Sequence, residues 1–150
     1  MRLLIQRVEK AQVLVSNEIV GKIDKGLLVF QGVEDFDNHD DINWLVNKVI
    51  NLRIFNDSNN AMNLSVKDIE GEVLVVSQFT LMASLKKGNR PSYIKASGQN
   101  HANLMYKKLI TELEFSLGKL IQTGIFRANM KVELVNDGPV TIWMDSKDKQ

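Results

Sequence analysis

Apolar and polar residues alternate through the first third of the chain, as they do in strands with one buried and one exposed face. The alternating runs fall at residues 3–5, 13–15, 19–20 and 26–30, and turn-forming residues such as Asn17 separate them. This part of the chain is therefore predicted to form a series of short β-strands.

Two later segments carry apolar residues at the spacing of helical turns. The first follows Asp40 and Asp41, either of which could cap a helix. The second ends at Gly118, and glycine commonly terminates helices. We therefore predict two amphipathic helices. Their apolar stripes consist of Ile42, Leu45, Val46, Val49 and Ile50 in the first and Ala102, Met105, Leu109, Leu113 and Leu117 in the second.

The remaining segments predict further strands and one long loop. Residues 53–55 form a short strand, residues 73–78 a buried strand, and residues 83–99, rich in Gly, Pro and Ser, a loop. Two strands at 130–135 and 140–144 are joined by a polar connection. Short connections favour antiparallel pairing, so the pattern predicts an α+β fold. We expect mostly antiparallel β-sheets in a barrel- or sandwich-like core flanked by the two helices.

The composition fits one globular domain over residues 1–150. Apolar residues make up 44% and charged residues 25% of the chain, which are ordinary values for this class. The absence of cysteine excludes disulfides, thiolate nucleophiles and cysteine-held metal sites, and we expect neither a metal nor another cofactor. The apolar stretch Leu3 to Ile5 is too short for a signal peptide, and no run reaches the roughly 20 apolar residues of a membrane-spanning helix. We therefore expect a cytoplasmic protein with no membrane partner.

The charge is unevenly distributed, although its net value is only +1. No Asp or Glu occurs between Val73 and Thr111. A stretch that carries only positive charge can attract a polyanion to one face of the protein, but it can equally be an ordinary solvated surface. The charge distribution alone does not distinguish these two interpretations. The basic residues of this stretch are Lys86, Lys87, Arg90, Lys95, His101, Lys107 and Lys108.

The polar segment Ser77-Gln78-Phe79-Thr80 follows directly on the buried residue Val76. Its hydroxyl and amide groups could bind or polarise a carbonyl, and its backbone N–H groups could stabilise an oxyanion. Alternatively, Ser77 and Thr80 only satisfy backbone groups at the end of a strand. The segment alone leaves both interpretations open.

The segment Asn136-Asp137-Gly138-Pro139 is also unusual, because the chain contains only two prolines. A peptide bond before proline adopts the cis form at a cost of only about 0.5–1 kcal/mol, and a preceding glycine removes a side chain that would crowd the backbone. Such a step can direct carbonyl oxygens toward a ligand, but it can also be a simple hairpin turn.

These two segments and the landmarks between them, read together, resemble the D-aminoacyl-tRNA deacylase (D-tyrosyl-tRNA deacylase) family. The resemblance covers nearly the whole chain in order, and both motifs at this separation are far more specific than either alone. The matching segments are Leu4–Val8, Gly26–Val29, Gly32–Val33, Arg53–Phe55, Met62–Leu64, Ser77–Leu81, Gly88–Ser92, Gln122–Gly124, Phe126, Met130 and Asn136–Thr141.

The resemblance implies an enzyme that hydrolyses the ester between a D-amino acid and the terminal adenosine of tRNA. It also implies a homodimer with active sites at the subunit interface, in which a cis Gly-Pro step reaches into the partner's pocket. The main-chain oxygens of Gly138 and Pro139 would hold the α-amino group of the substrate, and an L-residue would drive its side chain into this backbone. Glycine has no such side chain, so some activity on glycyl-tRNA is expected.

The resemblance assigns roles to further residues. Ser77, Gln78, Phe79 and Thr80 would form the catalytic segment, with the backbone N–H groups of Phe79 and Thr80 as oxyanion donors. The ribose 2′-hydroxyl would assist hydrolysis, and no residue is evident as a base for a Thr80 nucleophile. The other expected site residues are Asn136 and Arg7 for chiral selection, with Arg7 bracing the Gly-Pro loop, Phe126 and Met130 for the adenosine pocket, and Lys86, Lys87 and Arg90 for the tRNA backbone.

Some positions differ from the family pattern, namely Gln31, Tyr93, Arg127 and Asn129. They flank the motifs, so we expect them to affect substrate preference and tRNA contacts rather than activity. Two rival functions remain open. One is a related deacylase whose main substrate is achiral or L-configured, and the other is a nucleic-acid-binding module without catalysis.

Overall fold

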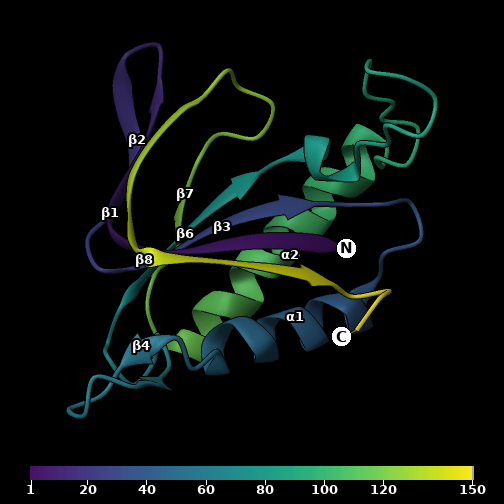
Figure 1. The fold of residues 1–150 in the computed structure, drawn as a ribbon. Coiled ribbons are helices and arrows are strands. Elements are labelled where there is room, and N and C mark those ends of the chain that lie inside the picture. Colours follow the sequence, from purple (N-terminus) through teal and green to yellow (C-terminus); the bar gives the residue numbers. More distant parts are fainter. Residues whose placement is uncertain (150) are drawn as a thin grey trace.

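The computed structural model describes residues 1–149. Strands dominate the first half of this range, and the two long helices lie far apart in the sequence (Figure 1). No helix in the described range is long and apolar enough to cross a bilayer. In chain order the elements are β1 (Arg2–Val15), β2 (Glu18–Ile23), β3 (Gly26–Gly32), α1 (His39–Asn51), β4 (Phe55–Asn56), β5 (Met62–Leu64), β6 (Glu72–Ser77), the 3-10 helix η1 (Phe79–Met82), α2 (Gln99–Leu117), β7 (Gln122–Thr123) and β8 (Lys131–Asp145).

The main sheet has the strand order β2-β1-β3-β6-β7, and β8 pairs with the other edge of β1. Among the described strands, β3–β6 and β6–β7 are the only parallel pairs. The two ends of the sheet approach each other, because a Cβ added to Gly21 in β2 would lie 2.3 Å from the carbonyl oxygen of Thr123 in β7. Only glycine fits this contact. The result is a nearly closed, barrel-like sheet, which confirms the predicted mostly antiparallel α+β fold.

Strand β1 contributes to two apolar cores because it is long and bends at irregularities in its pairing with β8. Its first half, including Leu3 and Ile5, packs in the core that the helices cover. Its second half, including Val8 and Val13, packs inside the curved sheet with Leu74 of β6. One strand therefore connects both layers of the fold.

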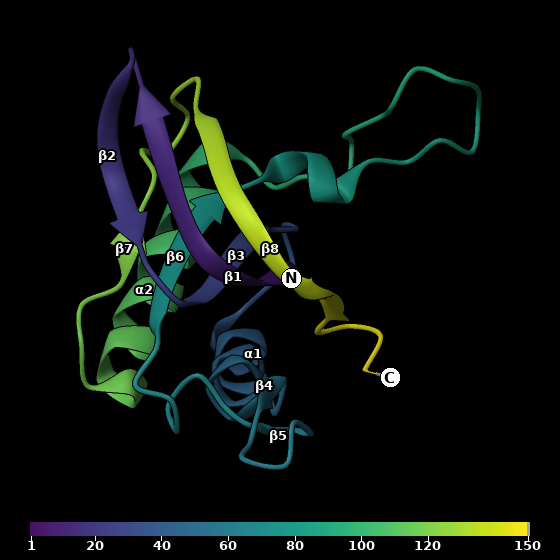
Figure 2. The same ribbon diagram turned by 60° about the vertical axis from the view of Figure 1, so that its left-hand side comes forward.

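Helices α1 and α2 lie on one side of the sheet and pack against each other (Figures 1 and 2). Helix α1 begins after Asn38, whose side chain accepts a hydrogen bond from the N–H of Asp40, while the carboxylate of Asp41 accepts from the N–H of Asn38. The predicted cap at Asp40 or Asp41 was therefore wrong, because Asn38 also has a capping side chain and has the extended backbone of a cap residue, while Asp40 and Asp41 already lie inside the helix. Helix α2 ends at Gly118 with φ of +74°, as predicted.

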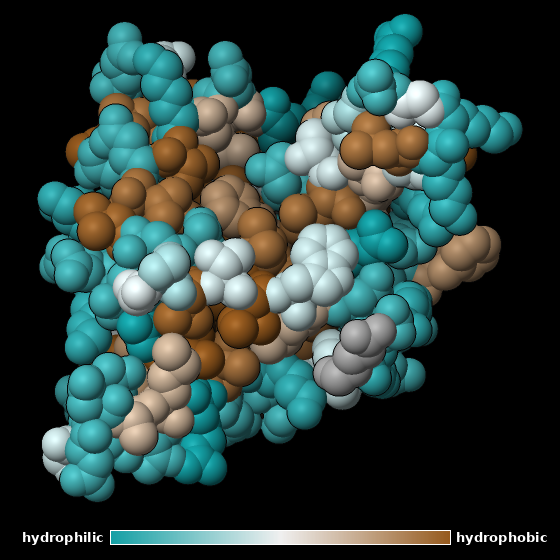
Figure 3. Space-filling model, in the orientation of Figure 1, coloured by the Kyte–Doolittle hydropathy of each residue, from teal (hydrophilic) through white to brown (hydrophobic). Residues whose placement is uncertain are grey.

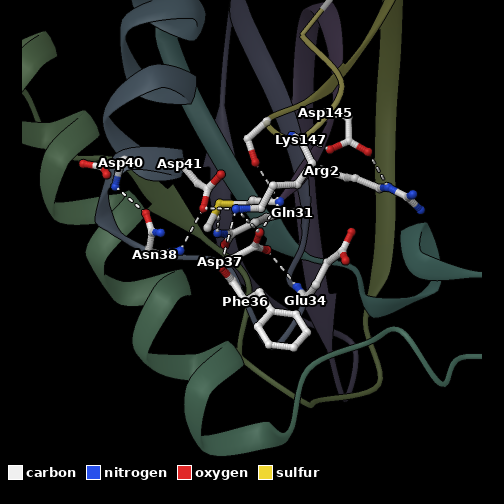
Figure 4. Close-up of polar contacts among 12 residues, drawn as sticks. Arg2, Gln31, Glu34, Phe36, Asp37, Asn38, Asp40, Asp41, Asp145 and Lys147 are labelled. Atoms are coloured by element: carbon white, nitrogen blue, oxygen red, sulfur yellow. Dashed lines mark hydrogen bonds and ion pairs between the residues drawn. The ribbon is translucent and has the colours of Figure 1, made fainter.

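Ion pairs tie the start of β1 to the loop before α1 and to the last residue of β8 (Figure 4). The buried amino group of Met1 pairs with the carboxylate of Asp37. Lys147 donates to Asp41 at 2.8 Å. The side chain of Arg2 donates to Asp145 at 2.9 Å. These contacts fix both ends of the described chain beside the N-terminus of α1.

Residues 131–145 form the single strand β8 rather than the two strands joined by a polar connection, so that prediction was wrong, and the alternative of a hairpin turn at Gly138-Pro139 is excluded. Both halves of β8 run antiparallel to β1, with Val8 opposite Asn136 and Gln6 opposite Thr141. Residues 137–140 are therefore extra residues opposite Arg7, and they bulge out of the ladder.

Candidate active site

A cavity of about 510 Å³ opens where β6 passes into η1, beside the first turns of α2. It brings together two regions of the chain that the sequence analysis singled out separately. Ser77, Gln78 and Phe79 come from the end of β6, while Phe126 and Met130 come from the segment before β8. The other residues lining it are Gln31, Val33, Val76, Ala96, Ser97, Gln99, Ala102, Tyr106, Arg127, Ala128 and Val132.

The polar segment at this cavity is held by the end of the parallel pair β3–β6. Ser77 is the last residue of β6 and pairs with Gln31. The N–H of Gln78 then donates to the carbonyl oxygen of Gln31 at 2.7 Å. The chain turns into η1 immediately afterwards, so the N–H groups of Phe79 and Thr80 find no acceptor in residues 1–149. Unpaired donors of this kind are available to a ligand oxygen.

Aromatic rings form two sides of the cavity. The ring of Phe126 lies 5.8 Å from that of Tyr106, centroid to centroid, and the ring of Phe79 meets that of Tyr93 edge-on at 5.0 Å. The hydroxyl of Tyr106 donates to the carbonyl oxygen of Val75 at 2.8 Å. Burial raises the pKa of Tyr106 to about 12. Tyr106 is therefore a neutral wall of the cavity and not a general base at neutral pH.

Thr80 lies next to the cavity but does not line it. Its hydroxyl oxygen accepts a hydrogen bond from the side-chain amide of Gln78. Within the described range, neither this hydroxyl nor that of Ser77 is hydrogen-bonded to a histidine or a carboxylate. Within the described residues the site therefore contains unpaired N–H donors and aromatic walls, but no hydrogen-bonded pair of nucleophile and base.

The Gly138-Pro139 peptide is cis, and Gly138 has φ of +126°. Arg7 contacts this bulge, since its Nε donates to the carbonyl oxygen of Asp137 at 3.0 Å and lies 3.1 Å from the Asp137 carboxylate. Asn136 holds the other side, because its Oδ1 accepts from the N–H of Val140 at 2.8 Å and its Nδ2 donates to the Val140 carbonyl at 3.3 Å. The bulge is thus fixed from both sides, and Gly138 and Pro139 themselves are exposed.

The expected site residues do not all meet within one chain. Arg7, Asn136, Gly138 and Pro139 do not line the cavity. The basic residues lie on a loop between η1 and α2 that projects away from the body of the molecule (Figure 2). The base of that loop is closed by two hydrogen bonds between Ser84 and Ser92. The basic residues on it are Lys86, Lys87 and Arg90, all exposed.

Sequence reasoning missed Tyr106 as a cavity residue. It lies beside Met105 in the stripe of α2, and an aromatic residue in that position is most simply interpreted as part of the core. Arg127 was noted only as a departure from a family pattern, although it lines the cavity. No cluster of three or more His, Cys, Asp or Glu side chains that could hold a metal ion occurs in the described range.

Comparisons with known proteins agree with one another. The family model described as D-Tyr-tRNA(Tyr) deacylase matches residues 4–145. D-aminoacyl-tRNA deacylases of Flavobacterium psychrophilum and Flavobacterium johnsoniae are 61% and 57% identical to this chain, and each alignment covers all of both proteins.

Two solved structures extend the comparison to the fold. A c-Myc DNA unwinding element binding protein superimposes with a TM-score of 0.92 at 36% identity and covers 97% of this chain and 98% of its own. A probable eukaryotic D-amino acid tRNA deacylase superimposes with a TM-score of 0.80 at 16% identity, with coverage of 95% and 97%, and so shares the fold. The sequence similarity over nearly the whole length, together with this architecture, shows that the chain belongs to the D-Tyr-tRNA(Tyr) deacylase family.

Proposed function

We propose that this chain hydrolyses the ester of D-aminoacyl-tRNA and releases the D-amino acid and tRNA. Family membership and the names of its full-length relatives support the reaction. The observation that carries the proposal is the position of the unpaired N–H groups of Phe79 and Thr80 beside an aromatic-lined cavity. This arrangement suits a nucleoside whose attached ester carbonyl reaches the end of β6.

In this proposal the terminal adenine binds against Phe126 and Met130. The ester carbonyl then lies at the segment Ser77 to Thr80, where the two backbone N–H groups receive the negative charge that develops on its oxygen. The side-chain amide of Gln78 keeps Thr80 in place through its hydrogen bond to the hydroxyl.

Hydrolysis requires a water molecule to add to the ester carbon and the bond from that carbon to the ribose oxygen to break. The ribose oxygen takes a proton and the amino acid leaves as its acid. We infer that the neighbouring ribose 2′-hydroxyl assists, because no His, Asp or Glu occurs among the described residues that line the cavity and an aminoacyl ester is already reactive. The protein then contributes position and oxyanion stabilisation.

Selection by handedness would come from the carbonyl oxygens of Gly138 and Pro139. Held against these oxygens by its α-ammonium group, a D-residue points its side chain away, while an L-residue collides with the backbone. Because the exclusion acts only on a side chain, we expect glycyl-tRNA to be hydrolysed as well.

A second copy of the chain would supply this segment, since Gly138 and Pro139 do not line the cavity of their own chain. Apolar side chains gather on the face crossed by β1 and β8 (Figure 3). On β8, Val135 and Trp143 keep 39% and 50% of their surface exposed. An apolar surface beside the bulge is suited to a homodimer interface.

The projecting loop with Lys86, Lys87 and Arg90 is proposed to contact tRNA phosphates. A protein acting on aminoacyl-tRNA is inferred to work in the cytoplasm.

The direct test is to incubate the purified protein with D-tyrosyl-tRNA, L-tyrosyl-tRNA and glycyl-tRNA and to measure loss of each ester. We expect rapid loss of the D-ester, measurable loss of the glycyl ester and background loss of the L-ester. Equal hydrolysis of D- and L-esters would overturn chiral selection, and loss of neither would leave a binding protein. Replacing the 2′-hydroxyl of the terminal adenosine of the tRNA by hydrogen should abolish hydrolysis of the D-ester but preserve binding of the tRNA.

A further inference from the structure

Arg127 is the only charged side chain among the described residues that line the cavity. The remaining lining residues are neutral, and their polar members are Gln31, Ser77, Gln78, Ser97, Gln99 and Tyr106. A neutral cavity with one cation at its edge fits a ligand that is aromatic in one part and anionic in another.

The guanidinium of Arg127 is exposed and makes no hydrogen bond or ion pair with any residue in the range 1–149. By contrast, Arg2, Arg7 and Arg53 each donate to a carboxylate or a carbonyl oxygen, while the exposed Arg90 lies on the projecting loop and does not line the cavity. Arg127 therefore keeps its full donor capacity for a ligand. Arginine is suited to phosphate because its planar fork can donate two parallel hydrogen bonds.

The backbone at Arg127 has φ of +67°, which is uncommon for a residue other than glycine. It lies in a turn closed by a hydrogen bond of 3.1 Å from the N–H of Ala128 to the carbonyl oxygen of Ile125. Arg127 follows Phe126 directly and precedes Met130 by three residues, and all three residues line the cavity. The Arg127 side chain thus starts from the wall of the cavity that Phe126 and Met130 form, which is the wall proposed to bind the adenine base.

We propose that Arg127 binds the phosphodiester on the 5′ side of the nucleoside held in this cavity. The inference rests on the proposed function, because it takes the terminal adenosine of tRNA as that nucleoside. Phe126 and Met130 contact the base, and Arg127 neutralises the adjoining phosphate. The contact is formed equally in the bound substrate and in the transition state, so Arg127 strengthens binding and does not take part in the chemical step.

Binding of two small probes tests this directly. Adenosine 5′-(methyl phosphate) carries the single negative charge of a phosphodiester, and adenosine lacks it. We expect the wild-type protein to bind the phosphate-bearing probe about tenfold more tightly than adenosine, measured by calorimetry or by NMR titration.

The substitution Arg127→Asn removes the charge while keeping a residue that tolerates positive φ. It should abolish the preference for the phosphate-bearing probe and leave adenosine affinity unchanged, whereas Arg127→Lys should keep part of the preference. Lys67→Asn is the matched control, because it removes one positive charge near the opposite end of β6 and should change neither affinity.

Activity gives a second readout. With D-tyrosyl-tRNA, Arg127→Asn should raise KM about tenfold with little change in kcat. With D-tyrosyl-adenosine, which has no phosphate, the variant and the wild-type protein should be equally active. Equal wild-type affinity for both probes, or an unchanged preference in Arg127→Asn, would overturn the role of Arg127 alone. Failure of adenosine to bind at all would overturn the proposed function instead.

Discussion

At the scale of single residues, Gly138 is constrained by both backbone and neighbours. Its φ of +126° lies in a region that side-chain-bearing residues rarely adopt. A Cβ at this position would lie 2.8 Å from Nη2 of Arg7 and 2.9 Å from Cγ2 of Val140. The residue proposed to face the substrate is therefore also part of how the bulge packs.

Gly138→Ala should lower the free energy of unfolding by about 1–3 kcal/mol and reduce hydrolysis of the D-ester. Gly88→Ala is the matched control, because Gly88 has φ of +116° but no atom within 4 Å of an added Cβ. Urea unfolding of both variants separates two contributions to the lost free energy of unfolding: the strain of a side-chain-bearing residue at positive φ, and the close contacts of the added Cβ. Equal losses in the two variants would contradict the crowding around Gly138.

Gln31 is 2% exposed, and its Oε1 accepts no hydrogen bond in the described part of the chain. Its Nε2 donates a weak hydrogen bond to the sulfur of Met1, at 3.1 Å. Because an unpaired buried acceptor is costly, Gln31→Met should raise the free energy of unfolding by about 1 kcal/mol. Gln99→Met, at an exposed position on the same cavity, should have no such effect. A clear loss of stability in Gln31→Met would mean that the amide has a partner.

At the scale of elements, the strands and helices were predictable because period-two and helical patterns depend on local burial. The prediction of two separate strands within β8 was wrong because Asn136-Asp137-Gly138-Pro139 suits a turn and a bulge equally well. Nothing in the local pattern indicates that both flanking halves pair with one long β1.

The candidate site was predictable only in part, for a related reason. The segment at Ser77 stands out locally, but the parallel pair β6–β7 is what brings residues 122–130 beside it. Pairing between strands that are far apart in the sequence cannot be predicted from the residue pattern of either strand alone. The grouping of Phe126 and Met130 with the segment at Ser77 came from a family resemblance. Tyr106 was missed because the helical spacing of apolar residues predicts which side chains are buried, but not which of them line a cavity.

The start of α1 gives a prediction about acid stability. Burial alone would raise the pKa of Asp41, but hydrogen bonds from Lys147 and Ser146 and from the Asn38 backbone outweigh it and hold the pKa below the ordinary value of 3.8. A carboxylate with a lowered folded-state pKa stabilises the fold above pH 3.8, and this contribution is lost as the pH falls below that value.

Asp41→Asn should therefore cost about 1 kcal/mol or less at pH 7, since Lys147 is partly exposed, and the difference from wild type should be smaller at pH 3. Urea unfolding at both pH values measures it. Asp40→Asn, at an exposed position in the same turn, is the control and should show a smaller effect at pH 7. A difference that persists unchanged at pH 3 would show that the cost comes from packing and not from the ion pair.

At the scale of the whole molecule, the cavity, the bulge and the projecting loop occupy different parts of one chain. In the proposed assembly the cavity binds the nucleoside, the loop contacts the backbone of the tRNA, and a second copy contributes the bulge. The first two parts can be tested separately from the third.

The combined substitutions Lys86→Gln, Lys87→Gln and Arg90→Gln should weaken tRNA binding. They should also reduce the slope of log affinity against log salt by about two to three, because each phosphate contact contributes roughly 0.7–0.9. The preference for D- over L-esters should not change. The control, Lys25→Gln with Lys67→Gln at the opposite end of β6, should leave the slope unaltered, and an unaltered slope in the loop variant would mean that the loop does not meet the phosphates.

The most direct measurement of the central claim uses a heterodimer that combines two defective chains. One chain carries Gly138→Ala and the other Phe126→Ala, and two different affinity tags isolate the mixed dimer. If the bulge of one chain completes the cavity of the other, the mixed dimer contains one intact site and should recover about half of the wild-type rate on D-tyrosyl-tRNA, while both parent homodimers stay nearly inactive. A mixed dimer no more active than its parents, or a protein that is monomeric at working concentration, would contradict the shared site.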